Sequence, residues 1–92
     1  MTKNIYNAIV AEVEEMATLV MNNDETKKVK YVKVDDRKFR VTFFCVTFFW
    51  NPSKKYSAVR VEEKRNGYEE VFEWDSTKTD ETFPDLFMDF IK

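Results

Sequence analysis

The longest run of strand-forming residues extends from Arg37 to Trp50 and constrains the fold more than any other segment. It is rich in Phe, Val and Thr and contains neither Gly nor Pro, which is typical of a strand on a half-buried pleated surface. Side chains of a strand alternate between two faces. One face therefore carries Phe39, Val41, Phe43, Cys45 and Phe49, whereas the other changes from polar to apolar along the strand. The second half of this strand thus needs cover on both faces.

The composition argues against an enzyme. A chain of 92 residues predicts one domain, residues 1–92, because two separate cores could not be built from so few residues. The sequence has no His and one Cys, which excludes Cys–His nucleophiles and zinc sites, and its one Gly argues against phosphate-binding loops. Glu62, Glu63, Glu69 and Glu70 are interpreted as a solvated ladder of ion pairs rather than an acid–base pair. We expect no catalytic residues, no metal and no cofactor.

Apolar periodicity predicts the order helix, four strands, helix. Apolar residues recur every three to four positions over residues 4–21, which favours a helix. Alternation of apolar and polar residues favours strands over 27–34, 37–50 and 55–64 and after Gly67. Pro84 suits the first turn of a short helix that ends near Ile91. The predicted fold is α+β: an N-terminal helix packed on a four-stranded, mainly antiparallel sheet, with a short C-terminal helix.

Turn residues fix a testable register for the hairpins. Asn66 and Gly67 predict a type I′ turn, which pairs Arg65 with Tyr68, Lys64 with Glu69, Val61 with Phe72, Arg60 with Glu73 and Val59 with Trp74. A chain reversal is predicted at residues 51–53 because Pro52 fixes one turn angle. With residues 50–54 as the loop, Phe44, Val46 and Phe48 would lie opposite Arg60, Ala58 and Tyr56.

Charge is segregated along the chain although the net charge is only −2. Residues 27–40 contain seven basic and two acidic residues, and residues 67–92 contain eight acidic and two basic ones. On the strand over residues 27–34, lysines favour protection of a sheet edge over nucleic-acid binding. Its alternation shifts between Tyr31 and Val32, which predicts a bulge or a register choice there. Asp35 and Asp36 are interpreted as a turn rather than as metal ligands.

The even-numbered face of the central strand is the candidate binding surface. Large rings and cations gather on it, and each exposed ring forgoes roughly 1.5 to 3 kcal/mol of burial. The candidate partner-binding residues are Arg40, Phe44, Phe48, Trp50, Tyr56 and Arg60.

Three interpretations of this surface compete. In the first, the C-terminal helix covers it and closes a three-layer domain. In the second, it binds another protein, because Trp, Tyr, Phe and Arg dominate interface energetics. In the third, its rings stack on the bases of a single-stranded nucleic acid.

We predict a small, non-enzymatic accessory or inhibitory protein that occupies a site on a larger protein. Single-stranded nucleic-acid binding is the alternative, and homodimerisation stays open. The single Cys favours a cytoplasmic setting, and no segment is long and apolar enough to span a membrane. A bacteriophage or mobile-element origin would suit this profile.

Overall fold

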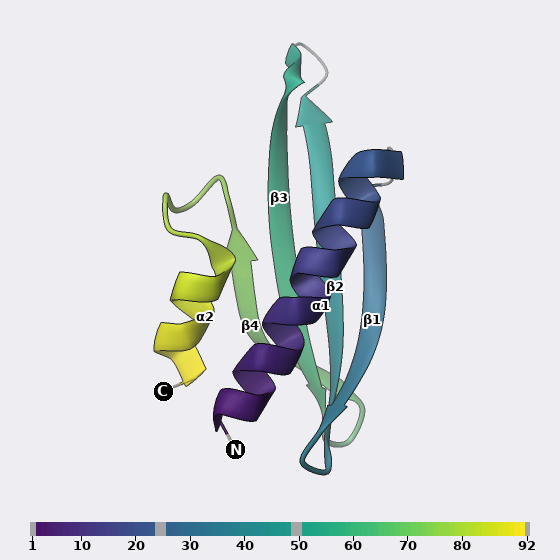
Figure 1. The fold of residues 1–92 in the computed structure, drawn as a ribbon, viewed down its shortest axis with the longest axis vertical. Coiled ribbons are helices and arrows are strands. Elements are labelled where there is room, and N and C mark those ends of the chain that lie inside the picture. Colours follow the sequence, from purple (N-terminus) through teal and green to yellow (C-terminus); the bar gives the residue numbers. More distant parts are fainter. Residues whose placement is uncertain (1, 24–25, 49–50, 92) are drawn as a thin grey trace.

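The computed structural model of the 92-residue chain describes residues 2–23, 26–48 and 51–91, with the side chains of 3–20, 26–45 and 56–91. The elements in chain order are α1 (Thr2–Asn23), β1 (Lys27–Val34), β2 (Arg37–Phe48), β3 (Asn51–Lys64), β4 (Tyr68–Asp75) and α2 (Phe83–Ile91). The four strands form one antiparallel sheet in the order β1-β2-β3-β4. Figure 1 shows both helices on the same side of this sheet. The predicted α+β fold is confirmed.

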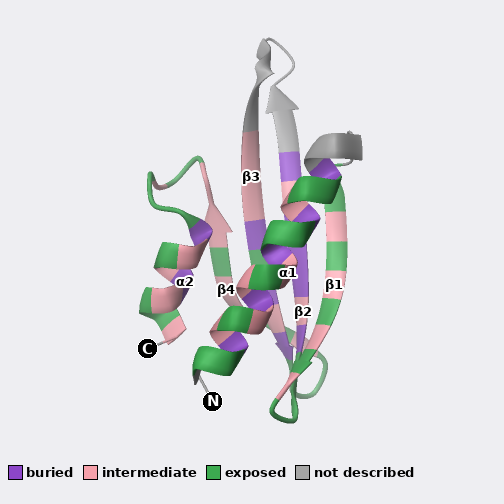
Figure 2. Ribbon diagram, in the orientation of Figure 1, coloured by how far each residue is buried: buried purple, intermediate pink, exposed green. Residues whose placement is uncertain are grey.

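The core lies between α1 and the central strands. The predicted stripe of α1 is buried, and it packs on the odd-numbered face of β2, where every described apolar side chain is also buried. Figure 2 shows this inward burial on both helices and on β2 and β3. Each such side chain stabilises the fold by roughly 1.5 to 3 kcal/mol. The main members are Ile5, Ile9, Val13, Met16 and Val20 of α1, Phe39, Val41, Phe43 and Cys45 of β2, and Val59 and Val61 of β3.

The C-terminal helix joins α1 on the same face, so the three-layer interpretation is wrong. Phe83 and Phe87 of α2 are buried, and their ring centroids lie 5.9 Å and 5.3 Å from that of Phe72 on β4. The Phe87 ring also stacks on Tyr6 of α1, with centroids 6.1 Å apart. The helix packs where β4 presents rings, because the opposite side of that strand is acidic and offers it little apolar surface.

Two contacts fix where α2 begins. The Thr82 hydroxyl accepts a hydrogen bond from the Asp85 backbone N–H at 3.3 Å, which is the geometry of a helix N-cap. The Trp74 indole N–H donates to the Glu81 carbonyl at 2.9 Å and ties the connector to β4. The connector therefore delivers α2 to the helix-covered face.

Strand β1 is regular: there is no bulge between Tyr31 and Val32, and the register choice is settled with the even-numbered residues on the helix side. Its eight residues pair with β2 without a register shift, from Lys27 opposite Phe44 to Val34 opposite Arg37. The apolar residues of different parity simply face different sides of the sheet. Asp35 and Asp36 have φ angles of 50° and 66°, so the predicted tight turn is present in left-handed geometry that Asp tolerates.

The β2–β3 hairpin differs from the prediction in its register and at its tip. Phe44 lies opposite Ala58, and Thr42 lies opposite Arg60, two residues away from the expected register. Residues 51–53 belong to β3 rather than to a reversal. Thr47 pairs with Lys55 and Phe48 with Asn51, so residues 52–54 have no β2 partner in the register. Pro52 suits such a stretch because it has no N–H to donate.

The β3–β4 hairpin confirms the inner part of the predicted register. Val59, Val61 and Arg60 lie opposite Trp74, Phe72 and Glu73 as expected. Nearer the turn the prediction is wrong, because Lys64 pairs with Tyr68 across a three-residue loop in which Gly67 has φ of 116°. A register shift between Val61 and Glu62 absorbs the extra residue at Val71.

Candidate protein-binding face

The sheet side turned away from the helices is called the open face. Neither helix packs on it, because both contribute to the single core on the opposite side. Its described side chains follow from strand alternation and the observed register. They are Lys27, Val29, Tyr31, Lys33, Lys38, Arg40, Thr42, Phe44, Tyr56, Ala58, Arg60, Glu62, Lys64, Tyr68, Glu70, Glu73 and Asp75.

Arg40 is held at the centre of the open face. Its Nε and Nη2 donate to the two carboxylate oxygens of Glu62, directly opposite on β3, at 2.9 Å and 2.8 Å. The guanidinium carbon lies 4.6 Å from the centroid of the Tyr68 ring, and the Tyr31 ring meets Tyr68 edge-on at 5.9 Å. Two tyrosines and one bidentate ion pair therefore form a fixed cluster on the surface.

The ion pair shifts both titrations toward the charged forms. The hydrogen bonds from Arg40 hold the pKa of Glu62 below its usual range, and the positive charge of Arg60 adds to this effect. Conversely, the bond to Glu62 raises the pKa of Arg40. Both groups are charged at neutral pH.

Phe44 forms a second ring–cation cluster on the open face. The Lys27 ammonium lies 5.8 Å and the Arg60 guanidinium 5.7 Å from the centroid of its half-buried ring. Arg60 Nε also lies 3.2 Å from a Glu70 oxygen. An open hollow of about 330 Å³ runs between the two clusters, from Lys27 and Phe44 past Thr42 to Arg40.

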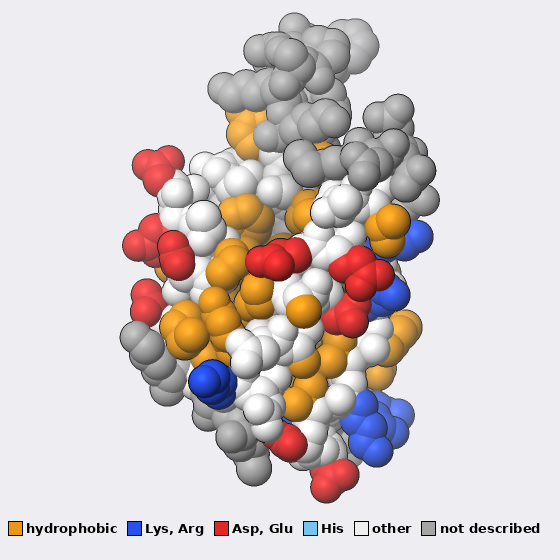
Figure 3. Space-filling model, in the orientation of Figure 1, with side chains coloured by type: hydrophobic (Ala, Val, Ile, Leu, Met, Phe, Trp, Pro, Cys, Tyr) orange, Lys and Arg blue, Asp and Glu red, His pale blue; other side chains and the backbone are white. Residues whose placement is uncertain are grey.

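The segregated charge places a gradient across the sheet. The open face carries Lys27, Lys33 and Lys38 on β1 and β2, whereas β4 carries Glu70, Glu73 and Asp75. On the helix side, Figure 3 shows most Lys and Arg side chains along β1 and a row of Asp and Glu side chains beside α2 and its connector. The basic and acidic edges are thus opposite edges of one sheet.

Four of the six predicted site residues lie on the open face. Arg40, Phe44 and Arg60 lie on the open face, and Tyr56 is half-buried in line with Ala58 and Arg60. The side chain of Phe48 and all of Trp50 lie outside the described residues.

Several members of the face were not predicted as binding residues, among them Val29, Tyr31, Glu62 and Tyr68. In β1, Val29 and Tyr31 are odd-numbered whereas Val32 and Val34 are even-numbered, and this difference could have shown that the two pairs lie on opposite faces. Tyr68 could not be placed, because the bulge at Val71 leaves no mark in the residue pattern.

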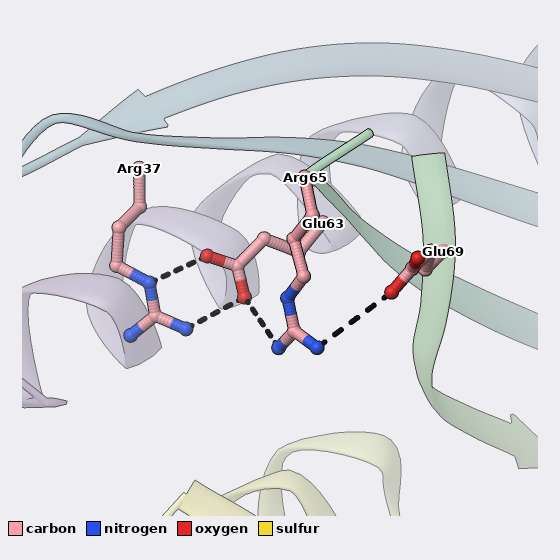
Figure 4. A network of polar contacts seen from close by, with 4 residues as sticks. All are labelled: Arg37, Glu63, Arg65 and Glu69. Carbon is pink, nitrogen blue, oxygen red and sulfur yellow. Dashed lines mark hydrogen bonds and ion pairs between the residues drawn. The ribbon is translucent and has the colours of Figure 1, made fainter. Parts of the chain in front are cut away.

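A second polar network lies on the helix-covered face (Figure 4). Arg37 Nε and Nη2 each donate to Glu63 at 2.7 Å, and Arg65 Nη2 donates to the same carboxylate at 3.3 Å. Arg65 also lies 3.7 Å from Glu69. Hydrogen bonds from Arg37, then charge and a bond from Arg65, hold the pKa of Glu63 below its usual range although burial opposes this.

Glu63 corrects the interpretation of a solvated ladder. Its side chain is only 9% exposed, and it lies beside an apolar cavity of about 260 Å³ lined by Phe39, Val61 and Phe87. The glutamates do form ion pairs, but arginines from β2, β3 and the hairpin loop answer them.

The described residues contain no group of three or more His, Cys, Asp or Glu side chains placed to hold a metal ion. Cys45 is buried in the helix-covered core. In the same part of the chain, no helix is both long and apolar enough to cross a membrane.

No protein-family model matches the chain, and comparisons with curated proteins and with solved structures find no match either.

Proposed function

We propose that the protein is a non-enzymatic binding module that acts as an accessory or inhibitory factor by placing its open face on a larger protein. One observation carries the proposal: both helices cover the same face, which leaves the opposite side of the sheet without a second layer. Tyr31 on that side is 66% exposed. Its ring contacts that of Tyr68, and contiguous exposed apolar patches commonly mark interaction sites.

The residue types on the open face support a protein partner. Tyr and Arg are the side chains that contribute most at protein interfaces. Arg40 is already fixed by Glu62 and the Tyr68 ring, so binding would cost little additional side-chain entropy. The mixed charge of the face would orient a partner of complementary pattern.

Single-stranded nucleic acid is the second candidate. Lys33 and Lys38 lie directly opposite each other beside Tyr31. Their like charges repel each other, and a phosphate bound between them would relieve this repulsion. Two features favour protein: Arg40 and Arg60 are paired with carboxylates, and the β4 side of the face is acidic.

Co-purification of the tagged protein from a bacterial lysate, with and without nuclease, tests the proposal. A stoichiometric protein that survives nuclease and is lost with Tyr31→Ala would support it. Phe90→Ala is the matched control, because Phe90 is 52% exposed but lies on α2. Equal loss with both variants would contradict a role of the open face.

A labelled thymidine oligonucleotide separates the second candidate. A nucleic-acid binder should bind it with an affinity that falls steeply with salt and with Lys38→Glu. No binding at low salt would remove this candidate.

A further inference from the structure

The outer edge of β1 is available for strand pairing. β1 is the first strand of the sheet order, and its inner edge pairs with β2 through all eight residues without interruption. Among the described residues, no strand pairs with its outer edge. It contains no Pro and no bulge, so its lysines are what protects it from pairing, and they do so against neutral or basic strands rather than acidic ones.

Apolar side chains border this edge on both sides of the sheet. Val29 and Tyr31 on the open face are 36% and 66% exposed, and Leu19 of α1 is 36% exposed. Leu19 lies one turn beyond Glu15, whose carboxylate is 4.0 Å from Lys30 on β1, so it shares the flank of α1 that faces β1. Three of the four large hydrophobic residues exposed in the described part of the chain thus flank one edge.

The charge of the edge selects its occupant. β1 contains Lys27, Lys28, Lys30 and Lys33 and no acidic residue. Among the described residues, the acidic groups close to β1 include Glu15 on α1 and the two aspartates of the turn after β1. Two copies of β1 would place lysines against lysines, which is unfavourable, whereas an acidic strand would be complementary.

We propose that the β1 edge binds an extended acidic segment of another protein, which adds a fifth strand to the sheet. The segment presents carboxylates opposite the four lysines and β-branched or small apolar residues opposite Val29 and Tyr31. Backbone hydrogen bonds supply the affinity and the alternating side chains supply the selectivity. This inference rests on the proposed function and names the chemistry of the partner.

A synthetic peptide provides the probe. Eight residues long, it carries Glu opposite each lysine of β1 and Val or Thr opposite the other four residues. Titration into the ¹⁵N-labelled protein should shift the amide resonances of residues 27–34 and slow hydrogen exchange at alternate amides of β1. A peptide with Lys in place of every Glu should not bind.

Backbone methylation separates strand pairing from simple charge attraction. Methyl groups on the peptide nitrogens that face β1 should weaken binding about tenfold or more, because several hydrogen bonds are lost. The same number of methyl groups on the outward nitrogens is the matched control and should leave binding unchanged. Equal weakening by both peptides would overturn strand addition.

Charge reversal in the protein gives the second comparison. Lys33→Glu should lower the affinity for the acidic peptide about threefold to tenfold, because one cross-strand ion pair becomes repulsive. Lys64→Glu, on the interior strand β3, should change affinity less than about twofold because salt screens it.

The outcomes for the inference and for the proposed function are distinct. No peptide binding, together with loss of the co-purified partner on Tyr31→Ala, would overturn strand addition and leave the proposed function standing. Protection of β1 amides that rises with protein concentration in the absence of peptide would show that a second copy occupies the edge, and would also overturn the inference.

Discussion

Two arginine–glutamate pairs lie on opposite faces of the same sheet; their glutamates are adjacent on β3 and their arginines are three positions apart on β2. Arg37 and Glu63 are on the helix-covered face, and Arg40 and Glu62 are on the open face, each pair joined by two short hydrogen bonds. The surroundings differ. Glu63 binds a second guanidinium beside the apolar core, whereas the guanidinium of Arg40 lies 4.6 Å from the half-buried ring of Tyr68.

The same bidentate arginine–glutamate pair has a different role on each face of the sheet. On the covered face it satisfies a carboxylate that the core would otherwise leave without partners. On the open face the carboxylate is almost as buried, 12% exposed against 9%, and the pair holds Arg40 against the ring of Tyr68, which contacts Tyr31. We therefore expect changes on the covered face to affect stability, and changes on the open face to affect binding.

The largest effect is expected from a ring of the covered face. Phe87→Ala should lower the free energy of unfolding by about 3 to 5 kcal/mol, because the ring is 2% exposed and packs on Phe72 and Tyr6. Phe44→Ala on the open face should cost roughly 1 kcal/mol, since its ring is only half-buried. Urea unfolding followed by circular dichroism measures both losses. Equal losses would show that the open face stabilises the fold as much as the covered face does.

Neutralising the two glutamates sharpens the comparison. Glu63→Gln should lower the free energy of unfolding by about 1.5 to 3 kcal/mol, because charged hydrogen bonds from two arginines are weakened next to the core. Glu62→Gln should lower it less, because one guanidinium alone donates to Glu62 among the described hydrogen bonds. A larger loss with Glu62→Gln would show that the open face stabilises the fold.

Acid should weaken the protein through these same carboxylates. The folded pKa values of Glu62 and Glu63 are lowered by Arg40 and Arg37, so their contribution is fully present above the unfolded glutamate pKa of about 4.3. It is lost as the pH falls through the folded values. Urea midpoints measured from pH 6 to pH 3 should fall, and the fall should be shallower in Glu63→Gln than in the wild type.

The smallest effect on stability is expected from the most exposed ring. Tyr31→Ala should change the free energy of unfolding by less than about 0.5 kcal/mol, because the residue is 66% exposed. Partner capture should nevertheless be lost. Thermal melts of the same preparations used for co-purification provide the control, and a loss above about 1 kcal/mol would mean that the ring is structural.

Much of the fold could be predicted from local patterns. The α1 stripe, the uniform face of β2 and the complementary pairs of β3 and β4 each depend on neighbours in the sequence or on one hairpin. The position of α2 could not be predicted, because its stripe would suit either face of the sheet. That choice depends on ring contacts of Phe87 with Tyr6, which is 81 positions earlier in the chain.

The candidate site was predicted in part for a related reason. Arg40, Phe44 and Arg60 follow from alternation within long strands, which tolerates an error of two residues because parity is preserved. A shift of one residue is not tolerated in this way. The observed loop of Arg65–Gly67 introduces such a shift, and only the structure reveals where it ends.

The bulge at Val71 divides β4 into two parts whose side chains alternate in opposite phase. After the bulge, Phe72 and Trp74 face the core. Before it, Tyr68 faces the open side of the sheet. Deleting Val71 would remove only the extra residue, because Glu70 would stay opposite Glu62 and Tyr68 would stay opposite Lys64. The open face is therefore protected against the loss of one residue at this point of β4, whereas a one-residue deletion in a regularly paired stretch would turn the side chains beyond it to the other face of the sheet.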